Sequence, residues 1–326
     1  MILIISSESD QSTSEVIKWL IRNNKAYIRL GEQQFVNNLY FTLESSGIQI
    51  SLKIGGSLIN FNQIKSFWFR KHTLEILSNL EIRLEAKEKN LRSPYLKEYL
   101  VDEEMDSIRQ FLFYELEKKN HLGNFKVDEG NKLISFSIAA DCGFKIPTSY
   151  ISSDLKWLKQ KFEHSGKLMV KPIEDGYLSI HNKIWVTGSY DIATASLFEN
   201  KENTIFPSCL QSYLDKKMEL RIFYLKGQCY SMAIFSQSNP KTKIDFRNYD
   251  DDKPNRFVPY NLPKTIEAQT IEFMKKMDLK TGSLDLILTS SNEYVFLEVN
   301  PVGQYGMVSN PCNYKLDKKI AQELAA

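Results

Sequence analysis

The sequence lacks the residue patterns that mark a zinc site or a disulfide scaffold. Its four cysteines show no C-x-x-C spacing, and its four histidines form no H-x-x-x-H or H-x-x-E pattern. Scattered single cysteines are typical of free thiols in a reducing compartment, and a zinc site needs clustered cysteine or histidine ligands. The sequence therefore argues against a zinc protein and against a disulfide-stabilised secreted domain.

Long apolar runs and an excess of one charge are also missing. The first residues, MILIISSESD, have a short apolar run and then Glu8 and Asp10, and no later stretch is long enough to cross a bilayer. The formal net charge of +2 gives no reason to expect a nucleic acid or a membrane as partner. We therefore predict a cytoplasmic protein that binds neither.

Two common nucleotide fingerprints, G-x-x-x-x-G-K-[ST] and G-x-G-x-x-G, are absent, and no internal repeat occurs. The length of 326 residues allows two or three domains or subdomains, and a hydrophobic content of 42% supports a sizeable core. A nucleotide site in this chain must therefore be built in another way.

The order of elements predicts an α/β protein. A β-branched run at Ile2–Ile5, apolar residues at helical spacing from Val16 to Ile21, and a second run ending at Leu30 indicate a parallel β-α-β unit. A polar, glycine-bearing segment marks a domain boundary near residue 122. The long charged segment 238–263 is interpreted as a mobile loop or a site loop.

The sequence SLDLILTSSNEYVFLEVNP has two apolar runs around a short polar turn, which predicts a β-hairpin. A two-residue loop at residues 291–292 would place Asp285 directly opposite Glu298, and Asn300 shares a face with Glu298. Like charges facing each other across a ladder are destabilising unless a positive group lies between them. An all-oxygen set suits Mg²⁺ or Mn²⁺ better than zinc. The alternative is a shifted register with one carboxylate exposed, and spacing alone does not separate the two.

A lysine within an apolar strand is the next candidate. Lys167, Met169 and Lys171 alternate along one face of the run KLMVK, and an unpaired buried ammonium group is costly, so Lys171 suggests a bound anion. The alternative is an edge lysine whose ammonium group reaches water.

Two arginines stand beside acidic residues. Glu219 and Arg221 share one face of an apolar strand, and Asp245 and Arg247 lie in the polar loop. Arginine is the residue that grips phosphate or carboxylate with two parallel hydrogen bonds. The alternatives are an internal ion pair without function and solvated loop charges.

Taken in order from Asn131 to Gly306, these motifs resemble those of the ATP-grasp superfamily: a lysine, a strand lysine, a hinge, E-x-R, an arginine loop and D…E-x-N. They are most similar to ATP-grasp peptide maturases of the microviridin type, the graspetide synthetases, especially the grasp-with-spasm branch of Bacteroidetes. The stretches that carry this resemblance are FWFRKHT, DFR, LEVNPVGQYG and NPCNYKLDKKIAQEL.

The resemblance implies an ATP-grasp fold of the α/β (α+β) class. An N-terminal pre-ATP-grasp α/β domain would span residues 1–122. Two α+β subdomains that clasp ATP would follow, a central one at 123–205 and a C-terminal one at 206–326.

It also implies roles for individual residues. Those expected to contact ATP are Lys132 and Lys171 at the phosphates, Gln211, Ser212 and Tyr213 at the adenine, and Glu219 at the ribose. Those expected to stabilise the transferring phosphoryl group are Arg221 and Arg247, with Asp245 or Glu174 as candidate proton acceptor. Those expected to bind two Mg²⁺ ions, or Mn²⁺, are Asp285, Glu298 and Asn300.

The implied activity is ATP-dependent macrocyclisation of a ribosomally made precursor peptide, consisting of leader and core, by a homodimer. Side-chain carboxylates would be activated as acyl phosphates and joined to hydroxyls or lysine amines. Two alternatives stay open. One is an intermolecular carboxylate–amine ligase, such as a glutathione synthetase-like or glutamate-adding enzyme. The other is a non-catalytic peptide- or nucleotide-binding module on a degenerate ATP-grasp fold.

Overall fold

The computed structural model describes residues 1–34, 36–71, 103–125, 131–173, 177–180, 183–186, 191–199, 202–248 and 250–326. The chain forms two compact units. Unit 1 comprises Met1–Asp128 together with Lys315–Ala326, and unit 2 comprises Glu129–Tyr314. Glu174, one of the two candidate proton acceptors, lies outside the described residues.

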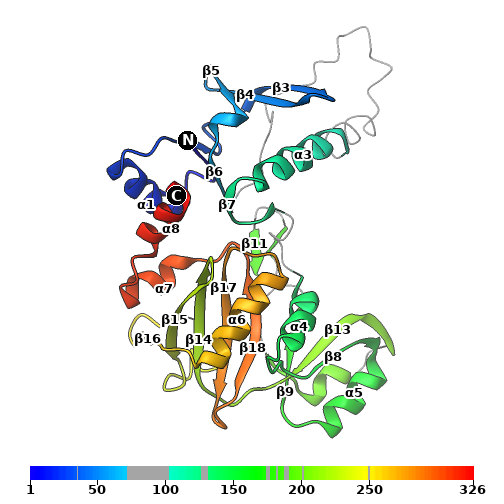
Figure 1. Ribbon diagram of the computed structural model, residues 1–326. Coiled ribbons are helices and arrows are strands. Elements are labelled where there is room, and N and C mark those ends of the chain that lie inside the picture. Colours follow the sequence, from blue (N-terminus) through cyan, green and yellow to red (C-terminus); the bar gives the residue numbers. More distant parts are fainter. Residues whose placement is uncertain are drawn as a thin grey trace, which may run out of the picture. The chain divides into compact units, whose positions relative to one another are not determined.

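Unit 1 is built on a four-stranded parallel sheet in the order β2-β1-β6-β7 (Figure 1). Its strands are β1 (Ile2–Ser6), β2 (Tyr27–Leu30), β6 (Ser66–Lys71) and β7 (Asn120–Leu122). Helix α1 (Gln11–Arg22) connects β1 to β2, so the predicted parallel β-α-β unit is confirmed. The β-branched run at the start of the chain is the central strand, and Ile4 and Ile5 are fully buried.

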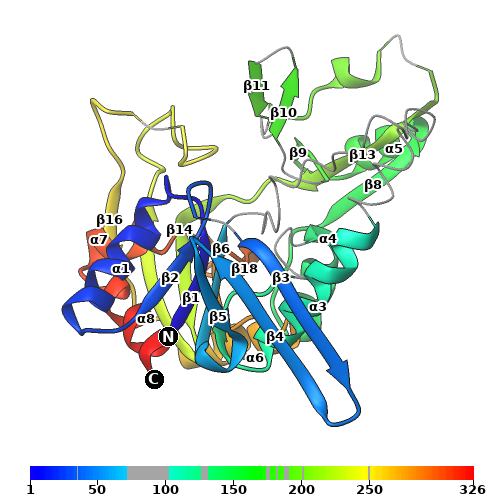
Figure 2. The ribbon, with the colours of Figure 1, turned by 90° about the horizontal axis from the view of Figure 1, so that it is seen from above.

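A three-stranded antiparallel sheet and a helix complete the core of unit 1. The sheet consists of β3 (Val36–Glu44), β4 (Gly47–Ile54) and β5 (Ser57–Asn60), followed by the 3-10 turn η1 (Phe61–Gln63), as Figure 2 shows from above. Helix α3 (Met105–Glu117) contributes Phe113, whose ring lies 5.4 Å from that of Phe69 and stacks on Phe125 at 4.0 Å.

The last helix, α8 (Leu316–Ala325), belongs to unit 1, although the sequence suggested a C-terminal subdomain running to residue 326. Its buried face packs against α1, β6 and β7. The side chain of Asn120 donates to the carbonyl oxygen of Glu323 at 2.8 Å, and the Trp19 indole donates to Asp317. The chain therefore leaves unit 2 at Tyr314 and returns to its first domain.

A buried ion pair fixes the loop between β1 and α1. Asp10 caps α1 by accepting the backbone N–H of Ser12, and its Oδ2 accepts from Arg70 Nε at 3.1 Å. The Arg70 side chain is only 4% exposed. Burial alone would raise the pKa of Asp10, but Arg70 and the hydrogen bonds from Thr13 and Ser12 outweigh it and hold that pKa below its ordinary value. The arginine of the FWFRKH stretch therefore has a structural contact in unit 1.

This depressed pKa predicts a pH-dependent stability. The unfolded chain binds a proton at Asp10 more readily than the folded chain, so the stabilisation is present above the unfolded pKa of about 3.9 and is lost as pH falls through the folded value. We expect Asp10→Asn to lower the melting temperature at pH 7, and we expect this deficit to shrink as the pH falls below about 3.9. Thermal melts across this range measure it, with Glu15→Gln, in the exposed pair with Lys18, as control. An equal deficit at every pH would contradict this account.

Unit 2 begins with helix α4 and a four-stranded antiparallel sheet in the order β12-β9-β13-β8. The elements of this part are α4 (Lys132–Asp141), β8 (Ser149–Asp154), α5 (Leu155–His164), β9 (Leu168–Lys171), β12 (Asp191–Ile192), η5 (Ala195–Phe198) and β13 (Thr204–Ser212), with a separate hairpin of β10 (Tyr177–Ile180) and β11 (Lys183–Val186). Gly143, which has a φ of +82°, closes α4 two residues after its last helical residue.

The second part of unit 2 is a five-stranded antiparallel sheet in the order β16-β15-β14-β17-β18. Its strands are β14 (Lys216–Leu225), β15 (Gln228–Phe235), β16 (Arg256–Pro259), β17 (Thr281–Thr289) and β18 (Tyr294–Asn300). Helix α6 (Lys264–Lys276) lies across one face (Figure 1), where Phe273 meets Phe296 at 4.9 Å. Helix α7 (Tyr305–Cys312) packs Tyr305 against Phe223 at 5.8 Å.

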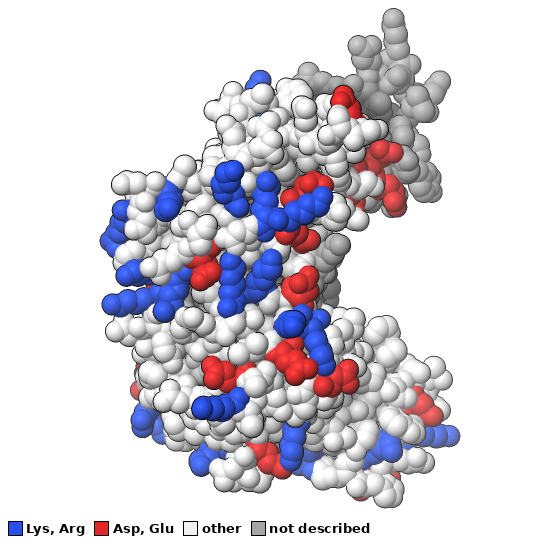
Figure 3. Space-filling model, in the orientation of Figure 1, with Lys and Arg blue, Asp and Glu red and all other residues white. Residues whose placement is uncertain are grey.

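Two surface properties bear on partners. Basic and acidic side chains are interspersed over the face drawn in Figure 3. Among the described residues, no helix combines the length and apolarity needed to span a membrane.

Candidate active site

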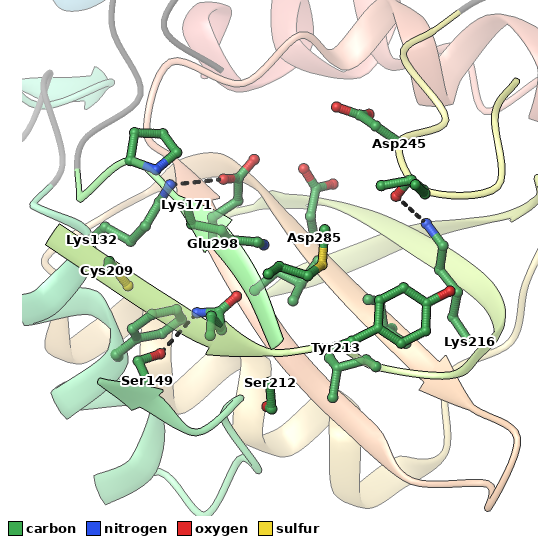
Figure 4. A pocket seen from close by; sticks show the side chains of 18 of the residues that line it. Lys132, Ser149, Lys171, Cys209, Ser212, Tyr213, Lys216, Asp245, Asp285 and Glu298 are labelled. Carbon is green, nitrogen blue, oxygen red and sulfur yellow. Dashed lines mark hydrogen bonds and ion pairs between the residues drawn. The ribbon is translucent and has the colours of Figure 1, made fainter. Parts of the chain in front are cut away.

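A pocket in unit 2 is lined by residues from its four-stranded and five-stranded sheets, from the start of α4 and from the loop 236–255 (Figure 4). Most of the predicted site residues line this pocket, and they are Lys132, Lys171, Gln211, Ser212, Tyr213, Glu219, Asp245, Arg247, Asp285 and Glu298. Arg221 and Asn300 are not among the lining residues. The structure thus brings together side chains that lie up to 166 positions apart between Lys132 and Glu298 (298 minus 132).

The carboxylate hairpin has the predicted cross-strand pair. Asp285 on β17 lies directly opposite Glu298 on β18, and both side chains point into the pocket (Figure 4). The loop has three residues, 290–292, rather than two. The backbone N–H of Thr289 donates to the carbonyl oxygen of Glu293, so these two residues close the loop, and the Thr289 carbonyl oxygen accepts the N–H of Asn292, which has a φ of +62°. A register shift after Asp285 compensates for the extra loop residue.

Arg221 supplies the positive charge that such a carboxylate pair requires. It lies opposite Asp285 on the neighbouring strand β14, and its Nη1 donates to the two carboxylate oxygens at 3.0 and 3.3 Å. Its Nε is buried and has no hydrogen-bond partner among the described residues. The arginine is therefore held against Asp285 through its Nη1.

Burial dominates the electrostatics of Asp285. Desolvation raises the pKa of this carboxyl above its ordinary value, the nearby Arg221 lowers it, and Glu219 raises it further. Additional positive charge in the pocket would favour the ionised form.

Lysines stand beside the second carboxylate. Lys132, the first residue of α4, reaches Glu298 with an Nζ–Oε2 distance of 3.8 Å. Asn131 caps this helix by accepting the N–H groups of Leu133 and Ile134, which fixes the position of Lys132. Lys171 ends β9 opposite Cys209, half-buried at the pocket wall.

The donor set fits a magnesium ion rather than a site made of protein ligands alone. Among the described residues there is no cluster of three or more His, Cys, Asp or Glu side chains. Mg²⁺ is usually bound by one or two carboxylates plus the phosphate oxygens of a substrate. Asp285 and Glu298 would hold the ion, and flanking lysines and arginines would hold the phosphates.

Glu219 lines the pocket, and one of its carboxylate oxygens is held by the protein. Its Oε1 accepts from Lys216 Nζ at 2.6 Å and from Ser236 Oγ at 2.8 Å. Burial raises the pKa of Glu219, while Lys216 and these hydrogen bonds lower it. Within the described residues Oε2 has no hydrogen-bond donor, so it can accept one from a ligand hydroxyl.

The hinge residues form the end of β13 and the connection to β14. Gln211 is buried, and its Nε2 donates to Ser149 Oγ at 2.9 Å. The N–H groups of Ser212 and Tyr213 donate to carbonyl oxygens on neighbouring segments at 2.8 and 2.9 Å. The next N–H group, that of Leu214, has no acceptor among the described residues and lines the pocket. It can bind the edge of a base.

Asn300 has a turn-forming contact in this structure. Its Oδ1 accepts the N–H of Gly303 at 2.8 Å, and its side chain is exposed at the end of β18. A Cβ on Gly303, at a φ of +52°, would lie 2.7 Å from Ser283 Oγ. The glycine therefore lets the segment after Pro301 fold closely onto β17.

Asp245 and Arg247, the two charged candidates in the loop 236–255, form an ion pair with each other. Arg247 Nε and Nη2 bind the Asp245 carboxylate at 2.9 to 3.1 Å, and the Arg247 side chain is 46% exposed. The predicted proton acceptor and the predicted phosphate ligand thus neutralise each other at the pocket rim.

Several lining residues were missed by the sequence analysis. The apolar ones are Ile151, Met169, Ile287 and Leu297, which a strand pattern shows only as core positions. Lys216 was also missed, because its direction depends on an irregularity of β14 that no sequence pattern shows. Leu214 follows the predicted hinge directly and contributes its backbone.

Comparison with known proteins identifies the fold. No protein-family model and no curated protein sequence matches the chain. Among solved structures, a RiPP-associated ATP-grasp ligase of Chryseobacterium gregarium, in complex with ADP and a leader and core peptide, has a TM-score of 0.78 at 23% identity, covering 99% of this chain and 95% of that one.

Two further structures show how far the similarity extends. The macrocyclase MdnC of Microcystis aeruginosa, bound to the precursor peptide MdnA, matches with a TM-score of 0.75 at 24% identity, covering 99% of both chains. The VanG D-Ala:D-Ser ligase of Enterococcus faecalis has a TM-score of 0.55 at 13% identity, covering 99% of this chain and 98% of that one. The predicted ATP-grasp fold of the α/β class is therefore confirmed.

Proposed function

We propose that this chain is an ATP-dependent macrocyclase of a ribosomally made precursor peptide, with Mg²⁺ as cofactor. The observation that carries the proposal is the carboxylate pair Asp285 and Glu298 in one pocket with Arg221 behind it and Glu219 beside it. This arrangement supplies metal ligands, a phosphate ligand and a hydroxyl acceptor together. It does so without the glycine-rich fingerprints of other nucleotide-binding folds.

The residues of the pocket have separate tasks. The hinge 211–214 receives the adenine, Glu219 Oε2 accepts ribose hydroxyls, and Lys132 and Lys171 hold phosphates. Bound Mg²⁺ neutralises charge on the phosphates and polarises the transferring group. Asp285 and Glu298 hold that ion, with Asn300 as a third ligand if its side chain leaves the turn with Gly303. A second ion would share these ligands.

The chemistry proceeds in two balanced steps. A peptide carboxylate oxygen attacks the γ-phosphorus, ADP leaves, and an acyl phosphate forms. A hydroxyl or amine of the same peptide then attacks the acyl carbon, phosphate leaves, and an ester or amide results. Arg221 and Arg247 stabilise the phosphoryl oxygens, and Asp245 accepts the proton of the nucleophile once its pair with Arg247 opens. Both groups belong to one bound peptide, which gives a high effective molarity.

Peptide macrocyclisation is favoured over ligation of a free amino acid by the comparisons. The neighbours with TM-scores of 0.78 and 0.75 are described with precursor peptides, whereas the amino-acid ligase reaches 0.55. The intermolecular ligase is the second candidate, because both classes share the same nucleotide machinery. The cytoplasmic location and the homodimer belong to the proposal as well.

Mass spectrometry tests the proposal. A short peptide encoded beside the gene, rich in Thr or Ser and Asp or Glu, is incubated with the chain, ATP and Mg²⁺. We expect the peptide to lose one water per crosslink as ADP is released. An unchanged peptide mass together with attachment of a free amino acid would instead establish the ligase. Binding of ATP without turnover of any peptide would favour a binding module.

A further inference from the structure

Lys216 is a buried cation in the pocket to which neither the sequence nor the two-step chemistry assigns a task. Its side chain is 5% exposed, and its Nζ donates to Glu219 Oε1 at 2.6 Å and to the carbonyl oxygen of Ile244 at 2.9 Å. A buried ammonium group is costly unless it is paired and hydrogen-bonded, so the contacts of Lys216 must offset the cost of its burial.

The direction of Lys216 depends on an irregularity of β14. Residues three apart in a regular strand point to opposite faces, so Lys216 and Glu219 should not meet. The pairing of β14 with β17 shifts between Lys216, opposite Thr289, and Met218, opposite Leu288. Such a bulge turns a side chain to the other face. It brings the ammonium group onto the pocket side, next to Glu219.

Lys216 joins two segments that border the pocket. Ile244 lies in the loop 236–255, directly before Asp245. The same loop is attached to Glu219 a second time, through Ser236 Oγ at 2.8 Å. Inside the loop, the Thr242 hydroxyl donates to the Ser236 carbonyl oxygen at 3.0 Å. This bond connects the attachment through Ser236 with the segment that contains Ile244. Figure 4 shows Lys216 extending from the strand toward the backbone beside Asp245.

We propose that Lys216 is a positioning residue that couples nucleotide binding at Glu219 to the placement of the loop 236–255. It holds Glu219 Oε1 so that Oε2 faces the nucleotide, and it anchors the carbonyl group next to Asp245 and Arg247. The part of this proposal that concerns the nucleotide rests on the proposed function, whereas the loop anchor does not. Replacing a residue with this role should change both the affinity for the nucleotide and the protection of the loop 236–255 from proteolysis.

Lys216→Met tests this coupling, because it keeps the length of the side chain and removes its donors. We expect ADP, titrated with Mg²⁺ by calorimetry, to bind about tenfold more weakly, as for loss of one buried charged hydrogen bond. Trypsin should also cleave faster after Lys241, Lys243 and Arg247, as mapped by mass spectrometry of the fragments. A purely local structural role would leave the loop cleavage unchanged.

The matched control is Lys217→Met on the same strand. Lys217 is exposed, and its Nζ donates to Asn292 Oδ1 at 3.4 Å, so this variant should bind ADP and resist trypsin like the wild type. Lys216→Arg, which keeps the charge and the donors, should restore both properties and serves if Lys216→Met melts at a much lower temperature. Wild-type ADP affinity or wild-type loop cleavage in Lys216→Met would overturn the coupling. Failure of the wild type itself to bind ADP would instead refute the proposed function, while the cleavage comparison would still test the loop anchor.

Discussion

Glu298→Gln should abolish turnover while the protein stays folded. The substitution keeps the shape of the side chain and removes the charge that we propose binds Mg²⁺, across from Asp285. We expect ADP release in the presence of the peptide to fall by about 100-fold or more, as for loss of a metal ligand. Because the Glu298 side chain is 30% exposed and its pair with Lys132 Nζ is 3.8 Å long, the melting temperature should change little.

The same hairpin offers a matched control, directly before β18. Glu293→Gln makes the identical chemical change five residues earlier, at an exposed residue that pairs with Lys145 away from the pocket. This variant should retain wild-type turnover. Full activity of Glu298→Gln would remove the metal-site assignment. Equal loss in both variants would mean that a general effect on the hairpin, and not the metal, is measured.

Arg221→Met should lose both activity and stability. In the proposed function the side chain stabilises the transferring phosphoryl group, and in the structure it pairs with Asp285, which is only 17% exposed. Breaking a buried pair by removing one partner leaves an uncompensated charge, at a cost of about 3 kcal/mol. Turnover should fall by about 100-fold or more. Denaturant unfolding and ADP release measure the two effects.

A double variant separates the two roles of Arg221. In Arg221→Met/Asp285→Asn the orphaned charge is gone, so we expect most of the lost stability to return while turnover stays absent. Because Asp285 is itself a proposed metal ligand, recovered turnover in the double variant would contradict the proposed roles of both residues. Wild-type stability of the single variant would show that the pair does not stabilise the fold.

The hairpin illustrates what the sequence could predict. The facing of Asp285 and Glu298 is correct, but the two-residue loop from which it was predicted is wrong. The loop holds three residues, which by itself would place Asp285 opposite Leu297. The register shift between Leu286 and Asp285 adds one residue on β18 and so places Asp285 opposite Glu298. Alternation of apolar residues defines which faces are buried, whereas loop length and bulges depend on packing that spacing does not reveal.

Lys216 and the last helix were beyond prediction for the same kind of reason. A lysine at the start of a strand, such as Lys216, is ordinarily exposed to solvent. Only the shifted pairing of β14 with β17 turns its side chain toward the pocket. The helix α8 has an amphipathic pattern, but its partner α1 lies about 300 residues earlier, as the Trp19–Asp317 contact shows. Periodicity shows that a face is buried and does not show against what.

The transfer of an oxygen atom tests the central claim most directly. The account holds that a carboxylate oxygen of the peptide attacks the γ-phosphorus and later leaves with the phosphate. Peptide whose side-chain carboxylates carry ¹⁸O is turned over with unlabelled ATP, and the released phosphate is analysed by mass spectrometry. The account predicts one ¹⁸O atom in each phosphate for every crosslink formed. Crosslinked peptide accompanied by unlabelled phosphate would contradict it.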